Sequence, residues 1–104
     1  MSGHTKGPWS YDLARTQQYQ IDIKVGADCL ATVYGSFGEN LQNARLIAVA
    51  PELLDDLCEA SATLRRYEAL HRAKNTEEST AKAEVNAELA ARFEATIAKA
   101  KGEA

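Results

Sequence analysis

The clearest hydrophobic pattern in the chain is a strict alternation of apolar and polar residues over positions 18–25. A period of two excludes a helix there and predicts a β-strand with one face in water. Gly26-Ala27-Asp28 is a turn signal before the short apolar segment 29–34, and together they predict a β-hairpin. Residues 9–13 are a weaker strand candidate. The apolar positions of the alternation are Tyr19, Ile21, Ile23 and Val25.

After residue 35 the apolar spacing becomes helical, which predicts a helix over residues 36–50. Ser36-Phe37-Gly38-Glu39 fits a capping box, in which the Ser hydroxyl and the Glu carboxylate satisfy free backbone N–H groups. Pro51 ends this helix because it lacks a backbone donor, yet a first helical turn tolerates proline, so a second helix is predicted over residues 51–74. The face expected to cover the sheet consists of Leu41, Ala44, Leu46, Ile47, Ala48 and Val49.

A third helix is predicted over residues 76–101, after a second capping signature at Asn75-Thr76-Glu77-Glu78. The predicted fold is therefore α+β, a single domain over residues 1–104. In it a flexible lead-in (1–8) and a three-stranded antiparallel β-meander (9–35) precede a short helix and a long two-helix hairpin. The apolar positions expected to face inward on the third helix are Ala81, Val85, Leu89, Phe93 and Ile97.

The two long helices outreach so small a sheet, so their apolar stripes must be covered by each other or by another subunit. With two phenylalanines and one tryptophan, the chain has little bulk for a self-contained core. We therefore expect a homo-oligomer. The alternative is a monomeric hairpin whose alanine-rich third helix frays.

Composition narrows the class of protein. The chain is 45% hydrophobic and 26% charged, as in ordinary soluble proteins, and no apolar run approaches the roughly 20 residues that cross a membrane. A net charge of −3 gives no basic field to attract nucleic acid, so DNA binding is disfavoured. Cys29 and Cys58 form no metal-binding or redox motif and are expected to be free thiols in a reducing cytoplasm.

Residues for catalysis are nearly absent, so neither an enzyme nor a cofactor is expected. His4 and His71 lack the spacing of metal ligands, and no metal site is predicted. The carboxylates around Asp55-Asp56 could share a helix face and bind a cation, although a solvated acidic stripe is the preferred interpretation. A basic cluster on the second helix is either a partner contact or a solvated face. It contains Arg65, Arg66, Arg72 and Lys74.

The N-terminal half is the better place for a ligand or partner site. Trp9 and Tyr34 supply aromatic surface near the predicted sheet, and such rings can stack on a base. Asn43 and Arg45 place an amide and a guanidinium on the first helix, where the guanidinium could bind a phosphate or carboxylate. The structural alternative is that Trp9 plugs the core and Arg45 ties the helix to a strand.

Two motifs bracket the predicted β region. They are Thr5-Lys6-Gly7-Pro8-Trp9 and Asn43-Ala44-Arg45-Leu46-Ile47-Ala48-Val49-Ala50-Pro51-Glu52-Leu53-Leu54. Together they resemble a widespread group of small phage and prophage proteins, including accessory proteins of lambdoid early regions. The resemblance covers residues 5–54 and implies a phage-type origin. Lys6 stands where such proteins often have proline, and the chain after Asp56 follows no pattern of the group.

Small phage accessory proteins without catalytic machinery often act by binding. The resemblance therefore implies a non-enzymatic inhibitor of host antiviral defence, acting in the bacterial host cytoplasm. Its partner would be a host defence protein, as for anti-CRISPR proteins, or a small nucleotide signal that it sequesters. The alternative is an accessory or regulatory phage protein that oligomerises through its helical tail and binds a host protein or nucleic acid.

Overall fold

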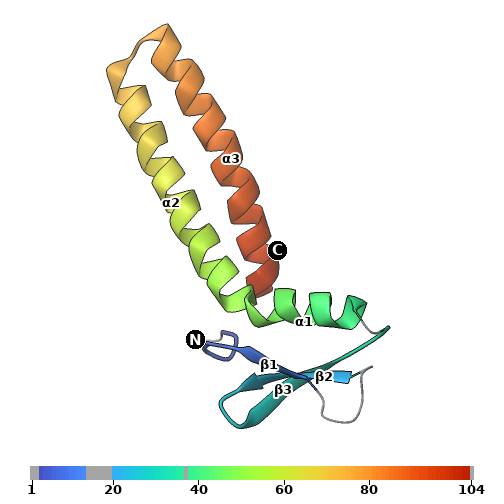
Figure 1. Ribbon diagram of the computed structural model, residues 1–104. Coiled ribbons are helices and arrows are strands. Elements are labelled where there is room, and N and C mark those ends of the chain that lie inside the picture. Colours follow the sequence, from blue (N-terminus) through green and yellow to red (C-terminus); the bar gives the residue numbers. More distant parts are fainter. Residues whose placement is uncertain (1–2, 14–19, 37, 104) are drawn as a thin grey trace. The chain divides into compact units, whose positions relative to one another are not determined.

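The structure is a computed structural model that describes residues 3–13, 20–36 and 38–103. It confirms the predicted α+β fold, because a three-stranded antiparallel sheet precedes a short helix and two long helices (Figure 1). The chain forms two compact units, Met1–Leu53 and Leu54–Ala104. The elements are β1 (Ser10–Leu13), β2 (Gln20–Val25), β3 (Asp28–Tyr34), α1 (Glu39–Ala48), α2 (Ala50–Lys74) and α3 (Glu77–Lys101).

The central strand of the sheet is β2, which pairs antiparallel with β1 on one side and with β3 on the other. Ile21 and Ile23 on β2 are buried, while Asp22 between them is only partly buried, as the alternating pattern predicts. Tyr19, the first residue of that pattern, lies outside the described residues. The apolar face of the sheet is therefore centred on the two isoleucines of β2.

The predicted hairpin between β2 and β3 is confirmed. Val25 pairs with Asp28, which leaves Gly26 and Ala27 as a two-residue loop. Gly26 has φ 60°, a conformation that side chains other than glycine rarely adopt and that two-residue hairpin loops require. The glycine thus fixes the loop length and, with it, the pairing of the two strands.

One narrow stripe of α1 covers the sheet. Ala44 is fully buried and packs with Ile21 and Ile23, and the partly buried Trp9, Val33 and Leu41 pack around them. The wider apolar face predicted for this helix is wrong in part. Its buried residues recur every fourth position, so side chains at the intervening positions point away from the sheet. The exposed members of the predicted face are Leu46 (63% exposed), Val49 (46%) and Ile47 (37%).

The predicted capping box at the start of α1 is also wrong. The helix begins at Glu39 rather than Ser36, its N-cap is Gly38, and no side chain bonds to the free N–H groups there. Ser36 contributes its carbonyl oxygen, which accepts from the backbone N–H of Asn40 at 3.0 Å. Gly38 has φ 99°, so the chain enters the helix through a backbone conformation instead of through a capping side chain.

The break between α1 and α2 falls where the sequence predicts it, next to Pro51. α1 ends at Ala48 and α2 begins at Ala50, which places Pro51 in the first turn of α2. A proline there removes only a donor that the first turn leaves free. The backbone N–H of Leu53 donates to the Val49 carbonyl at 2.9 Å and closes that turn.

The second unit is an antiparallel pair formed by α3 and the part of α2 from Leu54 onward (Figure 1). Asn75, with φ 53°, and Thr76 connect the helices. The Thr76 hydroxyl accepts from the Ser79 backbone N–H at 3.1 Å, which confirms the helix start predicted at the second capping signature. Of the helices in the described ranges, none combines the length and apolarity that a bilayer crossing requires.

The seam between α2 and α3 is built from small and polar residues. Ser61 on α2 and Ser79, Ala83 and Ala90 on α3 are buried, at spacings of four and seven residues along α3. Such spacing is typical of a coiled coil, in which small residues let two helices approach closely. The inward stripe predicted for α3 is wrong at Ala81, which is exposed, and at Val85, which is 64% exposed.

Candidate functional site

Trp9 contributes to the core of the first unit. Its ring is partly buried and packs against the cluster of Ile21, Ile23 and Ala44. The indole Nε1–H donates to the Thr5 carbonyl at 2.9 Å, and the His4 ring lies edge-on to the indole at 5.9 Å. These contacts place Trp9 as the structural alternative describes, with its polar atom bound by its own chain.

Arg45 connects α1 to the sheet. Its Nε–H donates to the hydroxyl of Tyr11 on β1 at 3.2 Å, across 34 positions of sequence. Both side chains are exposed, so the bond contributes little stability but fixes the direction of the guanidinium. This is the tie between helix and strand that the structural alternative describes.

Tyr34 and Asn43 are the other two candidates in the first unit. Tyr34 ends β3 and is 70% exposed, and Asn43 lies on the exposed side of α1. Across residues 3–13, 20–36 and 38–103, no hydrogen bond, ion pair or ring contact joins Trp9, Tyr34, Asn43 and Arg45 to one another. The structure therefore does not assemble them into one pocket, and their role in binding stays a prediction.

Two arginines of the basic cluster on α2 form ion pairs within the hairpin. Arg65 donates to both carboxylate oxygens of Glu94 on α3, at 2.6 and 3.0 Å, and to Glu68 at 2.9 Å. Arg72 donates to Glu68 at 2.9 Å. The hydrogen bonds from Arg65 come first among the causes that lower the pKa of the Glu68 and Glu94 carboxyls. Of the four residues of the cluster, Arg66 and Lys74 are exposed without an ion pair in the described part of the chain.

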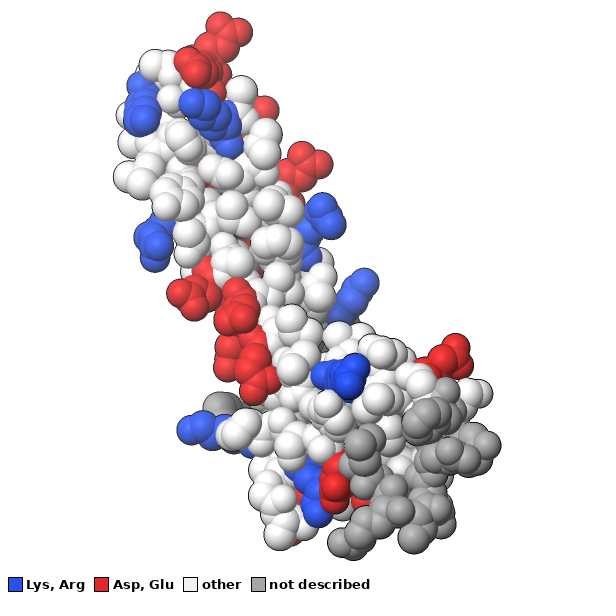
Figure 2. Space-filling view, in the orientation of Figure 1, with Lys and Arg blue, Asp and Glu red and all other residues white. Residues whose placement is uncertain are grey.

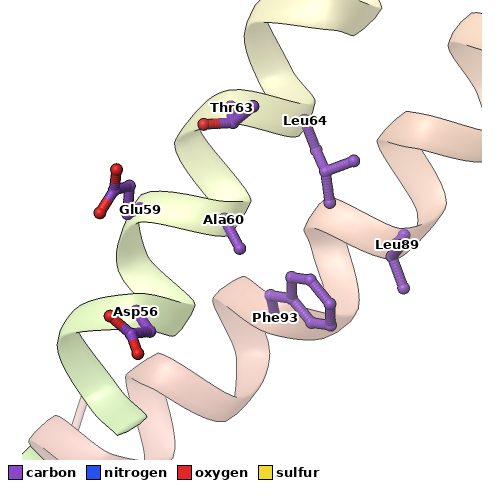
Figure 3. Close-up of a pocket in the computed structure, with 7 residues that line it drawn as sticks. All are labelled: Asp56, Glu59, Ala60, Thr63, Leu64, Leu89 and Phe93. Carbon is purple, nitrogen blue, oxygen red and sulfur yellow. The ribbon is translucent and has the colours of Figure 1, made fainter. Parts of the chain in front are cut away.

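An apolar groove runs along one side of the hairpin (Figure 3). Leu64 of α2 and Phe93 of α3 point toward one another in it, and the carboxylates of Asp56 and Glu59 lie along its α2 edge (Figure 3). Within the described ranges, no group of three His, Cys, Asp or Glu side chains is arranged to hold a metal ion. The residues lining the groove are Asp56, Glu59, Ala60, Thr63, Leu64, Leu89 and Phe93.

The groove continues toward the connection between the helices as exposed apolar side chains. Tyr67 and Leu70 each follow a groove residue of α2 by seven positions, and Val85 precedes Leu89 by four, so they lie on the same side of their helices. They are 51%, 60% and 64% exposed. We call this surface the hairpin face. Its residues are Ala60, Thr63, Leu64, Tyr67, Leu70, Val85, Leu89 and Phe93.

A second exposed apolar surface lies on α1 and on the residues that follow it, within the first unit. The sequence pattern predicts Leu46, Ile47 and Val49 on the face that covers the sheet, but the narrow stripe of Asn40, Ala44 and Ala48 excludes them from that face. We call this surface the α1 patch. It consists of Leu46, Ile47, Val49 and Leu53, which are 63%, 37%, 46% and 50% exposed.

Comparison with known proteins gives a family for this chain. Searches of curated proteins and of solved structures find none that is similar to this chain. A family model described as Salmonella phage P22 protein Y8K6 matches residues 1–104, the whole of the chain. The phage origin that the N-terminal motifs imply is thus supported over the helical tail as well, and the chain belongs to the family of Salmonella phage P22 protein Y8K6.

Proposed function

We propose that this phage protein is a non-enzymatic binding protein that inhibits host antiviral defence by binding a defence protein through the α1 patch. One observation carries the proposal. Apolar residues of the α1 segment that sequence reasoning assigned to the core are exposed: Leu46 by 63% and Val49 by 46%. Leu46 on α1 and Val49, the residue directly after that helix, are three positions apart, and apolar side chains presented to solvent at such spacing offer a surface that a groove on a partner can bind.

The polar residues around the patch support a protein partner. Asn43 lies on α1 one turn before Leu46, and it is exposed. Arg45 is held toward β1 by Tyr11. Protein interfaces typically combine an apolar centre with polar and arginine side chains at the rim. The arrangement therefore suits a folded protein better than a small charged ligand.

The test is an infection assay in a host strain that carries the defence system, together with a pull-down from lysate of infected cells. The wild type should raise phage plating efficiency and retain one stoichiometric host protein. Leu46→Asp should lose both effects, because a charge at the centre of an apolar interface is costly to bury. Ala27→Asp, which introduces the same charge at an exposed position of the β2–β3 loop, is the matched control and should behave as the wild type.

Two outcomes would count against the proposal. The first is a wild type that restores no phage growth against any defence system tested. The second is a Leu46→Asp protein that still inhibits and still retains its partner, since the α1 patch would then have no part in binding.

Sequestration of a nucleotide signal is the other form of this proposal. It is supported by Tyr34, whose ring is 70% exposed at the end of β3 and free to stack on a base. Thermal shift with cyclic di- and trinucleotides tests it: a ligand should raise the melting temperature of the wild type, and Tyr34→Ala should remove most of that rise. A melting temperature that no nucleotide changes would exclude this form.

A further inference from the structure

The hairpin face has the spacing of a second packing seam. The first seam joins α2 to α3 within one chain through small residues such as Ser61 and Ala90. On α2 the face residues Ala60, Thr63, Tyr67 and Leu70 repeat at intervals of three, four and three residues, as in a coiled coil. On α3 the face residues Val85, Leu89 and Phe93 recur every four residues.

The large apolar side chains of this second seam are left in solvent. Tyr67, Leu70 and Val85 are 51%, 60% and 64% exposed, whereas the buried residues of the first seam are serines and alanines. The hairpin thus places its smallest side chains inside and keeps bulky ones outside. A contiguous surface of this kind is typical of a face that another helix pair covers.

The charges beside the hairpin face are divided between its edges. Asp56 and Glu59 lie on the α2 edge of the groove. Arg92 follows Leu89 by three positions and therefore lies on the same side of α3, a helix along which Figure 2 shows both basic and acidic side chains. In the described part of the chain none of the three forms an ion pair. Each edge therefore carries charge that its own chain leaves unpaired.

The opposite charges lie at the same level of the hairpin. Glu59 is 16 residues before Asn75, and Arg92 is 16 residues after Thr76, so antiparallel helices of equal rise place them level with each other. Within one chain, however, they stand on opposite edges of the face. A partner surface that is basic where this one is acidic, and acidic where it is basic, would pair both.

We propose that the partner is a second copy of this chain, whose hairpin face packs on this one about a two-fold axis parallel to the helices. Such an axis places α2 of one copy against α3 of the other, and residues at equal distances from the helix connection then lie beside each other. Glu59 and Asp56 of each copy then meet Arg92 of the other, and Tyr67 meets the level of Val85. The product is a four-helix bundle in which both α2 helices begin at the same end.

The size of the face fits such a dimer. From Leu54 to Lys74 the helix is roughly 30 Å long, and two packed helices are roughly 20 Å wide, so the face covers about 600 Å² of each copy. Standard stable interfaces cover about 800 Å² of each partner. We therefore expect a dimer that dissociates at low protein concentration. This inference goes beyond the proposed function, because it uses a different surface.

Sedimentation equilibrium of the full chain over a wide concentration range tests the dimer. The wild type should approach twice the chain mass of 11.3 kDa. Leu70→Glu and Val85→Glu should each remain monomeric, because they place a carboxylate on the apolar surface that the second copy would cover. Ala69→Glu and Ala91→Glu introduce the same charge at exposed positions off the face and should dimerise as the wild type does. Helicity measured by circular dichroism confirms that each variant folds.

A charge exchange tests the orientation. Arg92→Glu should weaken self-association by at least about tenfold, because attraction becomes repulsion at both symmetric sites. The double variant Asp56→Lys/Glu59→Lys should be weakened in the same way. When the two variant proteins are mixed, every acidic edge meets a basic one, so a heterodimer should form at near the wild-type affinity. Glu84→Lys, which changes an exposed charge off the face, should leave self-association unchanged.

Either of two results would overturn the inference. A wild type that stays monomeric at every concentration would remove the dimer. Self-association of Arg92→Glu and of Asp56→Lys/Glu59→Lys as strong as that of a dimeric wild type would remove the parallel arrangement, because an antiparallel dimer sets α2 against α2 and α3 against α3, where each variant only replaces one like-charged pair by another. Host-protein retention through Leu46 is scored separately, so a failure of the dimer and a failure of the proposed function give different results.

Discussion

Glu68 is the carboxylate that accepts hydrogen bonds from both Arg65 and Arg72, each at 2.9 Å. These bonds, the one from Arg65 first, lower the pKa of its carboxyl from an ordinary value of 4.5. A carboxyl whose pKa is lower in the folded than in the unfolded state stabilises the fold above the unfolded pKa. That stability is lost as the pH falls through the folded pKa.

We therefore expect the thermal midpoint of the wild type to exceed that of Glu68→Gln at neutral pH and to approach it as the pH falls below 4.5. Circular dichroism at 222 nm during heating measures both proteins, and Glu88→Gln, at an exposed carboxylate without an ion pair in the described part of the chain, is the control. A difference between wild type and Glu68→Gln that does not change with pH would show that the arginine bonds do not stabilise the hairpin.

The roles of single side chains were only partly predictable. The helical spacing places Arg45 on an outer side of α1, but its partner depends on how β1 lies beside that helix. Tyr11 is 34 positions away, and no local pattern links the two residues. Trp9 is similar, since its burial depends on Ile21 and Ala44, which come from two different elements. The sequence therefore leaves two alternatives for Trp9 and Arg45, a structural role or a role in a binding site, and cannot distinguish between them.

At the level of single elements, Gly38 decides how α1 begins. Its φ of 99° is rare for residues with a side chain, although nothing lies within 4 Å of the position that a Cβ would take. Gly38→Ala should therefore lower the free energy of unfolding by about 1–2 kcal/mol through backbone strain alone. Urea unfolding followed by Trp9 fluorescence measures the change. Gly3→Ala has equal space and no positive φ, and should leave stability unchanged.

The same position explains why the capping box misled the prediction. Ser36 and Glu39 have the right spacing for reciprocal caps, and spacing is all that the sequence shows. The cap requires Ser36 to immediately precede the first helical residue, but the helix begins at Glu39. Thr76 succeeds in the same role because the helix starts directly after it. A capping motif thus predicts a helix more reliably than it predicts the first residue of that helix.

Faces were harder to predict than boundaries on the long helices. A stripe at every fourth residue, from Ala81 to Ile97, drifts around an ideal helix, so it cannot all face one neighbour. The buried Ala83 and Ala90 follow the seven-residue repeat of two packed helices. Because the residues at these positions are small, a prediction based on hydrophobicity alone selects the bulky Val85 instead, which is exposed.

For the whole molecule, the order of elements followed from periodicity alone. A period of two, a turn, and then helical spacing interrupted at Pro51 are local signals, and they led to the confirmed α+β fold. The exposed apolar surfaces could not be predicted from periodicity, because the sequence does not show which apolar residues of each helix are buried against a neighbouring element. The α1 patch and the hairpin face contain apolar residues that are left exposed, and these residues could be recognised only once the buried residues of each helix were known.

Self-association of the whole chain should also appear in its thermal stability. If two hairpins unfold and dissociate together, mass action raises the midpoint with protein concentration, by about 3–6 °C for each tenfold increase. A monomeric hairpin, held by small residues such as Ala83 and Ala90, would melt at one temperature regardless of concentration. Circular dichroism at concentrations spanning two decades distinguishes the cases. Leu70→Glu should melt lower and without concentration dependence, whereas Ala69→Glu should keep the slope of the wild type. Equal slopes for the two variants would mean that the hairpin face has no part in stabilising the folded chain.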